Sequence, residues 1–322
     1  MIKTDIFSGF LGAGKTTLIK KLADEAYKGE KLVIVENEFG EIGIDKGFLE
    51  DSGIEITEMN SGCICCTLVG DFTKALEKVA HELAPDRIII EPSGVGKLSD
   101  VKEAAMEVGE IEVAAGVTVV DAKKCKMYMK NFGEFFNNQI ENADIIVLSH
   151  TKDMAEAKLT EVVHMIREHN ADSQIITTDW DSISGKQILD AMNSCNHHHD
   201  HVHEHHHHEH HHHDHDCECG CHDHDHDHEH HHADEIFTSC GIETIHKFDK
   251  EEIGDILDHI EETGTVLRAK GIVEAKDGSW IHFDYIPGEK DIRTGGAQLT
   301  GKACVIGTDL DEDKIRKMFV SC

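Results

Sequence analysis

Three cysteines lie within four residues of one another, at Cys63, Cys65 and Cys66. Thiolates this close together can converge on one ion, and soft sulfur selects zinc, cobalt or copper(I) over magnesium and calcium. Incidental buried cysteines are the alternative interpretation. A second segment rich in histidine and cysteine lies further along the chain, so the pattern favours a transition-metal site.

A phosphate-binding loop precedes these cysteines. The sequence GFLGAGKT at 9–16 matches G-x-x-x-x-G-K-[ST] in full, after an apolar run and before a helical pattern. Backbone amides of such a loop surround the phosphates, Lys15 is expected to reach the β- and γ-phosphates, and the Thr16 hydroxyl to ligate Mg²⁺. The nucleotide-binding residues predicted here are Gly9, Gly12, Ala13, Gly14, Lys15, Thr16 and Thr17.

An acid and a glycine follow the apolar run at 88–90, in the sequence Glu91-Pro-Ser-Gly94. An acid at the carboxyl end of a parallel strand faces the crevice in which nucleotides bind. Glu91 is therefore predicted to hold the Mg²⁺ shell or to orient the attacking water. Gly94 is predicted to let a backbone amide approach the γ-phosphate. An ordinary exit from a strand is the alternative.

Acids and glycines are also concentrated in the sequence ENEFGEIGID at 36–45. A loop here would lie beside the nucleotide and could be a switch segment ordered by the γ-phosphate and Mg²⁺. A solvated acidic loop explains the composition equally well.

The composition changes completely between residues 196 and 233, which hold 21 of the 28 histidines of the chain. We expect this segment to be a disordered linker in the absence of metal. Imidazoles and thiols suit several transition metals, so the segment would raise the metal concentration near a specific site. A passive linker or a purification tag is the alternative. Its candidate ligands are His205, His207, His211, Cys217, Cys219 and Cys221.

Continuous apolar runs alternate with amphipathic helical patterns over residues 1–193. Such runs are typical of strands buried on both faces of a parallel sheet. The chain is therefore predicted to be an α/β protein with a doubly wound, mostly parallel sheet of the P-loop NTPase type. The expected strands are 3–8, 31–36, 87–91, 116–121, 144–149 and 174–177. Helices are expected at 16–27, 71–83 and 155–169, among others.

A globular pattern returns after the histidine-rich segment. Strands are expected at 236–245, 266–273 and 280–285, and helices at 250–263 and 311–319, which predicts a small α+β domain. The expected organisation is thus a P-loop domain at 1–193, a metal-binding linker at 194–235 and a C-terminal domain at 236–322.

The composition excludes some partners. The 322 residues carry a net charge of −32, so no basic surface is expected to bind nucleic acid. No stretch reaches the ~20 apolar residues of a membrane span, and the first residues do not resemble a signal peptide. Eleven cysteines beside a P-loop read as thiols and metal ligands instead of a disulfide framework. We therefore expect a reduced, cytoplasmic protein with no membrane or nucleic-acid partner.

The order of these motifs resembles the CobW family of P-loop GTPases, which are metallochaperones related to UreG and HypB. The resemblance rests on the P-loop, on the sequences ENEFGE at 36–41, GCICC at 62–66, EPSG at 91–94 and QIENAD at 139–144, and on RAKG at 268–271, which is similar to the start of the family's C-terminal domain. It implies GTP hydrolysis coupled to metal delivery. It also implies that Glu36 and Glu41 supply oxygen ligands beside the three thiolates.

One motif departs from the family pattern. The guanine-reading sequence Asn-Lys-x-Asp should follow the strand that ends near Leu148, where this chain has Ser149-His-Thr151-Lys-Asp153. Ser149 and Thr151 fall in the base-binding positions, whereas Asp153 comes one residue late. Guanine is still expected ahead of adenine, on the resemblance.

The leading interpretation is a GTP- and Mg²⁺-dependent metallochaperone that carries Zn²⁺, or else Co²⁺ or Ni²⁺, to a client metalloprotein or a metallocofactor-assembly protein. A nucleotide- or metal-dependent homodimer is a further expectation. Two alternatives from other classes are a metal storage protein with vestigial hydrolysis and a small-molecule kinase.

Overall fold

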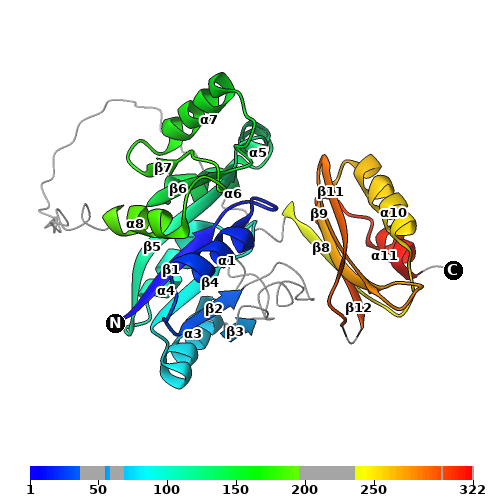
Figure 1. The fold of residues 1–322 in the computed structure, drawn as a ribbon, viewed down its shortest axis with the longest axis horizontal. Helices are drawn as coiled ribbons and strands as arrows, with labels where there is room; N and C mark the ends of the chain where they lie inside the picture. The colour runs from blue at the N-terminus through cyan, green and yellow to red at the C-terminus, as the bar shows by residue number, and fades with distance from the viewer. Residues whose placement is uncertain (37–54, 59–68, 196–235, 299, 321–322) are drawn as a thin grey trace, which may run out of the picture.

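The structure, a computed structural model, describes residues 1–36, 55–58, 69–298 without 196–235, and 300–320. Two separate sheets organise these residues (Figure 1). The first has seven strands in the order β3-β2-β4-β1-β5-β6-β7, and every neighbouring pair is parallel. Its strands are β1 (Ile2–Ser8), β2 (Leu32–Glu36), β3 (Glu55–Glu58), β4 (Arg87–Glu91), β5 (Ile111–Asp121), β6 (Ile145–Ser149) and β7 (Gln174–Ile176).

Helices cover both faces of this sheet. Successive side chains of a strand point to opposite faces, so Ile88 and Ile90 pack in one core while Ile89 packs in the other. Continuous apolar strands are the consequence of this double burial. The helices are α1 (Lys15–Glu25), α3 (Val69–Leu83), α4 (Leu98–Met106), α5 (Cys125–Asn131), α6 (Gly133–Glu141), α7 (Glu156–His169) and α8 (Gly185–Cys195).

The second sheet has five antiparallel strands in the order β11-β10-β9-β12-β8. Its strands are β8 (Thr238–Thr244), β9 (Val266–Glu274), β10 (Trp280–Ile286), β11 (Glu289–Gly295) and β12 (Gly301–Gly307). Helices α10 (Lys250–Thr263) and α11 (Glu312–Val320) cover one face. Residues of the opposite face, such as Leu267, Ile272 and Ile306, belong to one core with the helices of the first sheet.

Aromatic side chains join the two sheets. Phe237, directly before β8, lies with its ring centroid 5.3 Å from Phe135, 5.6 Å from Phe132 and 6.3 Å from Phe10. Phe10 belongs to the P-loop, so the C-terminal sheet is packed directly onto the nucleotide-binding loop.

The predicted fold class is confirmed: a P-loop α/β sheet followed by an α+β unit. The expected strands and helices are present. The bounds of β4 and α10 match the expected ranges, and each of the others is shifted at one or both ends by one to five residues. The sequence analysis placed no strand at β3, β11 or β12. The strand β11 is polar along its length, with six of seven residues charged, Thr or Gly, so no alternation of apolar residues marks it.

Candidate nucleotide and metal site

The P-loop lies between the end of β1 and the start of α1, at the carboxyl edge of the parallel sheet. Gly9 has φ 142°, and a Cβ there would lie 2.3 Å from the carbonyl oxygen of Val119 on β5. No larger residue fits this approach. The loop can therefore pass close over the sheet edge and turn its amides toward α1 only with glycine at this position.

Lys15, Thr16 and Glu91 come together at the mouth of this loop. The Thr16 hydroxyl donates to Glu91 Oε1 at 2.9 Å, and Lys15 Nζ donates to the Gly9 carbonyl at 2.9 Å. Lys15 and Glu91 are both buried. The three side chains predicted from motifs 75 residues apart in sequence thus share one site, beside the exposed Thr17 at the start of α1.

This donor set fits Mg²⁺. A threonine hydroxyl and a carboxylate are hard oxygen ligands of the kind that Mg²⁺ prefers. Neighbouring ligands in an octahedron with bonds of about 2.0–2.1 Å are about 2.9 Å apart, and the Thr16 and Glu91 oxygens are separated by 2.9 Å. The remaining positions would be taken by phosphate oxygens and water.

A row of acids marks the same edge. In the register of the parallel strands, Glu36 of β2 lies beside Glu91 of β4 on one side and beside Glu58 of β3 on the other. Glu36 is buried. The predicted oxygen ligand Glu36 therefore neighbours the predicted Mg²⁺ ligand.

Several predicted metal ligands lie outside the described residues. They are Glu41, Cys63, Cys65, Cys66, His205, His207, His211, Cys217, Cys219 and Cys221. Within the described ranges, no group of three or more His, Cys, Asp or Glu side chains is placed to hold a metal ion. Among the described cysteines, Cys125, Cys240 and Cys304 are buried and form no disulfide.

Gly94 packs against the P-loop itself. A Cβ at this position would lie 2.9 Å from the backbone nitrogen of Leu11, so glycine lets the loop after β4 touch the P-loop. Gln139 of α6 holds this loop, because its side-chain amide donates to the carbonyls of Gly94 at 3.1 Å and Gly96 at 2.8 Å. The sequence analysis assigned Gln139 no role in the site; only its place in the QIENAD sequence singled it out.

The candidate base-binding loop follows β6. Ser149 and Thr151 are buried, whereas Asp153 is exposed with a left-handed φ of 60°. Lys152 forms an ion pair with Asp181 at 2.7 Å. The late aspartate therefore turns toward solvent and does not restore the Asn-Lys-x-Asp pattern.

Trp180 packs beside this loop. Its indole donates to the Leu148 carbonyl at 2.9 Å, and its ring would lie 3.2 Å from a Cβ on Gly14. This aromatic ring, which the sequence analysis did not consider, connects the P-loop with the segment after β6.

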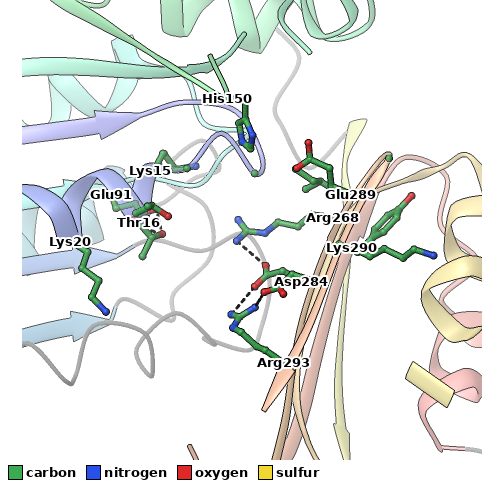
Figure 2. A pocket seen from close by; sticks show the side chains of 17 residues that line it. Lys15, Thr16, Lys20, Glu91, His150, Arg268, Asp284, Glu289, Lys290 and Arg293 are labelled. Carbon is green, nitrogen blue, oxygen red and sulfur yellow. Dashed lines mark hydrogen bonds and ion pairs between the residues drawn. The ribbon is translucent and has the colours of Figure 1, made fainter. Parts of the chain in front are cut away.

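The C-terminal sheet closes the other side of the site. A cavity of about 830 Å³ lies between the two sheets (Figure 2). P-loop residues, Glu91 and His150 line one wall, and Arg268, Asp284 and Arg293 of strands β9, β10 and β11 line the other. These C-terminal residues were missed because their strands are far from the P-loop in sequence.

The fold and the site define a P-loop nucleotide-binding protein with its phosphate loop and an acidic row at one sheet edge. The chain belongs to the CobW/HypB/UreG family, because the model of that family's nucleotide-binding domain matches residues 3–177 of the 322. The model of the cobalamin synthesis protein cobW C-terminal domain matches residues 237–322.

Curated relatives agree with this assignment. The chain is 30% identical over 188 residues to the zinc chaperone YeiR of Escherichia coli, with 58% of this chain and 57% of YeiR covered. It is 33% identical over 187 residues to the zinc chaperone CobW of Sinorhizobium sp, with 48% of this chain and 52% of that protein covered. It is 30% identical over 210 residues to the zinc-regulated GTPase metalloprotein activator 1 of Schizosaccharomyces pombe, with 61% of this chain and 51% of that protein covered. The chain spans about half the length of these relatives.

Among solved structures, the Zn(II)-bound YjiA GTPase from E. coli is 20% identical with a TM-score of 0.45, covering 99% of this chain and 98% of YjiA. HypB from Helicobacter pylori in complex with nickel is 19% identical with a TM-score of 0.44, covering 61% and 86%. Within the described part of the chain, the helices are too short or too polar to cross a bilayer.

Proposed function

We propose that the protein is a GTP-hydrolysing metallochaperone. Its cargo would be a transition metal, zinc in the first place with cobalt or nickel as alternatives, handed to a client metalloprotein or a metallocofactor-assembly protein. The observation that carries this proposal is the convergence of Lys15, Thr16 and Glu91 at a carboxyl edge that also holds Glu36.

Hydrolysis follows from the chemistry of these groups. Water attacks the γ-phosphorus, the bond to the β–γ bridging oxygen breaks, and GDP, phosphate and a proton leave. Lys15 is placed to move from the Gly9 carbonyl to the β- and γ-phosphate oxygens, where its charge opposes the charge that develops there. Mg²⁺ held by the Thr16 hydroxyl and the Glu91 carboxylate would supply further charge neutralisation when bound. Guanine as the base rests on the family, with Ser149 and Thr151 as the proposed neighbours of the base.

The attachment points of the cysteine segment support coupling to a metal. Glu58, at the end of β3, lies beside Glu36 in the sheet register, and Cys63 follows five residues later. Five residues span at most about 17 Å. Cys63 is therefore tethered within that distance of Glu58, the neighbour of Glu36. Cys65 and Cys66 follow within three more residues, and Glu41 comes five residues after Glu36 in the sequence. If GTP tightens metal binding, metal must tighten GTP binding by the same factor.

A metal titration tests this proposal. Zn²⁺, Co²⁺ and Ni²⁺ are titrated into the chain, and into a variant without residues 196–233, in the presence of Mg²⁺ with a non-hydrolysable GTP analogue or with GDP. We expect one tight ion per chain that weakens in GDP, and the same ion in the shortened variant. Cys65→Ser should lose this ion while keeping nucleotide affinity, whereas Cys322→Ser, outside the motif, should keep both. Equal metal affinity in Cys65→Ser would refute the thiolate assignment.

A storage function is the second candidate, and the 21 histidines between residues 196 and 233 favour it. Several ions would then bind per chain regardless of nucleotide, and the shortened variant would bind none.

Measuring the mass of the protein in both nucleotide states, with and without metal, would test the expected nucleotide- or metal-dependent homodimer in the same series.

A further inference from the structure

The cavity between the P-loop and the C-terminal sheet is unusually basic for this chain. Across the sequence, Asp and Glu outnumber Lys and Arg by 63 to 31. Among the residues lining the cavity, five are Lys or Arg and four are Asp or Glu. The lining therefore lacks the acidic excess of the chain as a whole, which favours anion binding beside the P-loop.

Three of these cations come from the C-terminal sheet, and they differ in where they point. Lys290 pairs with Asp258 of α10, on the far side of the sheet from the P-loop. Arg268 instead extends from β9 into the cavity toward Lys15 and Thr16 (Figure 2). Arg268 is thus the C-terminal cation directed at the P-loop.

The ion pair between Arg268 and Asp284 is long. The Asp284 carboxylate lies 3.7 Å from the Arg268 guanidinium. It also accepts a hydrogen bond of 3.4 Å from Arg293, which pairs closely with Asp291 as well. A well-formed pair between guanidinium and carboxylate has about 2.7–2.9 Å between the atoms. Asp284 therefore orients the Arg268 head group over a longer distance than in a well-formed pair, and a more highly charged anion in the cavity can compete with it.

The backbone of the sheet is meanwhile fixed against the P-loop. A Cβ on Gly12 would lie 2.5 Å from Ile286 Cγ2 at the end of β10. The ring centroids of Phe237 and Phe10 are 6.3 Å apart. Arg268 is only 19% exposed, which lessens the screening of its charge by water. A guanidinium in this position is preorganised, and its planar fork matches a phosphate in a way that a lysine does not.

We propose that Arg268 binds the terminal phosphate of the nucleoside triphosphate held by the P-loop, and that the C-terminal sheet is thereby part of the nucleotide site. This inference rests on the proposed function. On binding, the guanidinium exchanges Asp284 for the phosphate oxygens, and it returns to Asp284 when the phosphate leaves. The C-terminal sheet thus distinguishes triphosphate from diphosphate, which couples hydrolysis to the packing of that sheet.

The test compares two nucleotides on four full-length proteins. A fluorescent non-hydrolysable GTP analogue and fluorescent GDP, each with Mg²⁺, are titrated into wild type, Arg268→Ala, Arg268→Lys and Lys247→Ala. Lys247 pairs with Glu274 at the surface outside the cavity, so its variant controls for loss of one positive charge. We expect Arg268→Ala to bind the triphosphate analogue about 10- to 100-fold more weakly, since a hydrogen bond to a charged group is lost, with GDP affinity unchanged. Arg268→Lys, which keeps the charge and the packed stem, should show a smaller loss of the same kind.

The outcomes separate the inference from the proposed function. Equal triphosphate affinity in wild type and both Arg268 variants would overturn the inference alone, provided that Lys15→Ala abolishes binding. An equal loss for both nucleotides would also overturn it, because Arg268 would then act on the fold and not on the terminal phosphate. Wild type that binds neither nucleotide would overturn the proposed function and this inference together. If Arg268→Ala does not fold, the comparison of Arg268→Lys with wild type decides the question.

Discussion

Replacing Gln139 by leucine tests whether α6 positions the loop that follows Glu91. Gln139 is fully buried, and its amide donates to two loop carbonyls, Gly94 at 3.1 Å and Gly96 at 2.8 Å. Leucine has a similar volume and no donor, so the change removes the hydrogen bonds without opening a large cavity. The backbone carbonyl of Gln139, which accepts from Thr118 at 2.6 Å, is unaffected.

The expected loss of folding stability in Gln139→Leu follows from three buried polar atoms. Two carbonyls lose a donor, at about 1–3 kcal/mol each. Against this, the side-chain Oε1 of Gln139 is itself buried and has no hydrogen-bond partner among the described residues. Its removal therefore relieves a penalty of about the same size as one lost bond. The net destabilisation is about 1–3 kcal/mol, which corresponds to a fall of about 3–10 °C in Tm.

The assay has two readouts. Thermal unfolding gives the stability change, and steady-state hydrolysis gives the effect on the site. Because the loop carries Gly94 and follows Glu91, we expect kcat to fall by about tenfold with little change in GDP affinity. Asn131→Ala, an exposed position on the neighbouring helix α5, serves as control. Wild-type Tm and kcat in Gln139→Leu would refute the view that these two hydrogen bonds position the loop.

Three further predictions follow from the same structure. Lys15→Ala should lower hydrolysis by about two orders of magnitude or more. Lys21→Ala, six residues further along α1 and paired with Glu25, should hydrolyse GTP like wild type. Normal turnover of Lys15→Ala in a phosphate-release assay would contradict the P-loop assignment. Burial raises the pKa of the Cys125 thiol to about 12, so Cys125 in the native protein should resist alkylation by iodoacetamide at pH 8.5. Mass spectrometry that finds the Cys125 peptide alkylated quickly, before unfolding, would contradict that burial. At the start of α10, the Glu252 amide holds the pKa of Asp249 below its ordinary 3.8, and Lys276 holds the pKa of Glu252 below its ordinary 4.5. Both carboxylates therefore stabilise the fold above pH 4.5, and this contribution is lost as the pH falls through their lowered pKa values. The urea midpoint of the wild type should thus decline more steeply below pH 4.5 than that of the Asp249→Asn, Glu252→Gln double variant. Parallel declines of the two midpoints would argue against the helix cap.

The local patterns in the sequence were enough to predict the nucleotide half of the site. A P-loop needs consecutive residues of fixed type, and a strand buried on both faces needs a continuous apolar run. Gly9, Lys15 and Thr16 were therefore identified together with β1, and Glu91 with β4. The convergence of Thr16 and Glu91 could be predicted as well, because parallel strands end at a common edge whatever lies between them in sequence.

The rest of the site depended on contacts that no local pattern encodes. Gln139 reads as one polar residue in an amphipathic helix, and its role exists only because α6 packs beside the loop at Gly94 and Gly96. The late Asp153 was suspected from its register, but its exposure is decided by the turn after β6.

By itself, the sequence determined a P-loop α/β fold, its acid at the end of β4 and a cysteine motif downstream of the P-loop, since each is encoded in neighbouring residues. Only the tertiary structure decided that Arg268, Asp284 and Arg293 face the P-loop. They reach it because β9, β10 and β11 pair side by side and the sheet face not covered by α10 and α11 packs toward Phe10. These long-range contacts leave no periodic signal in the chain.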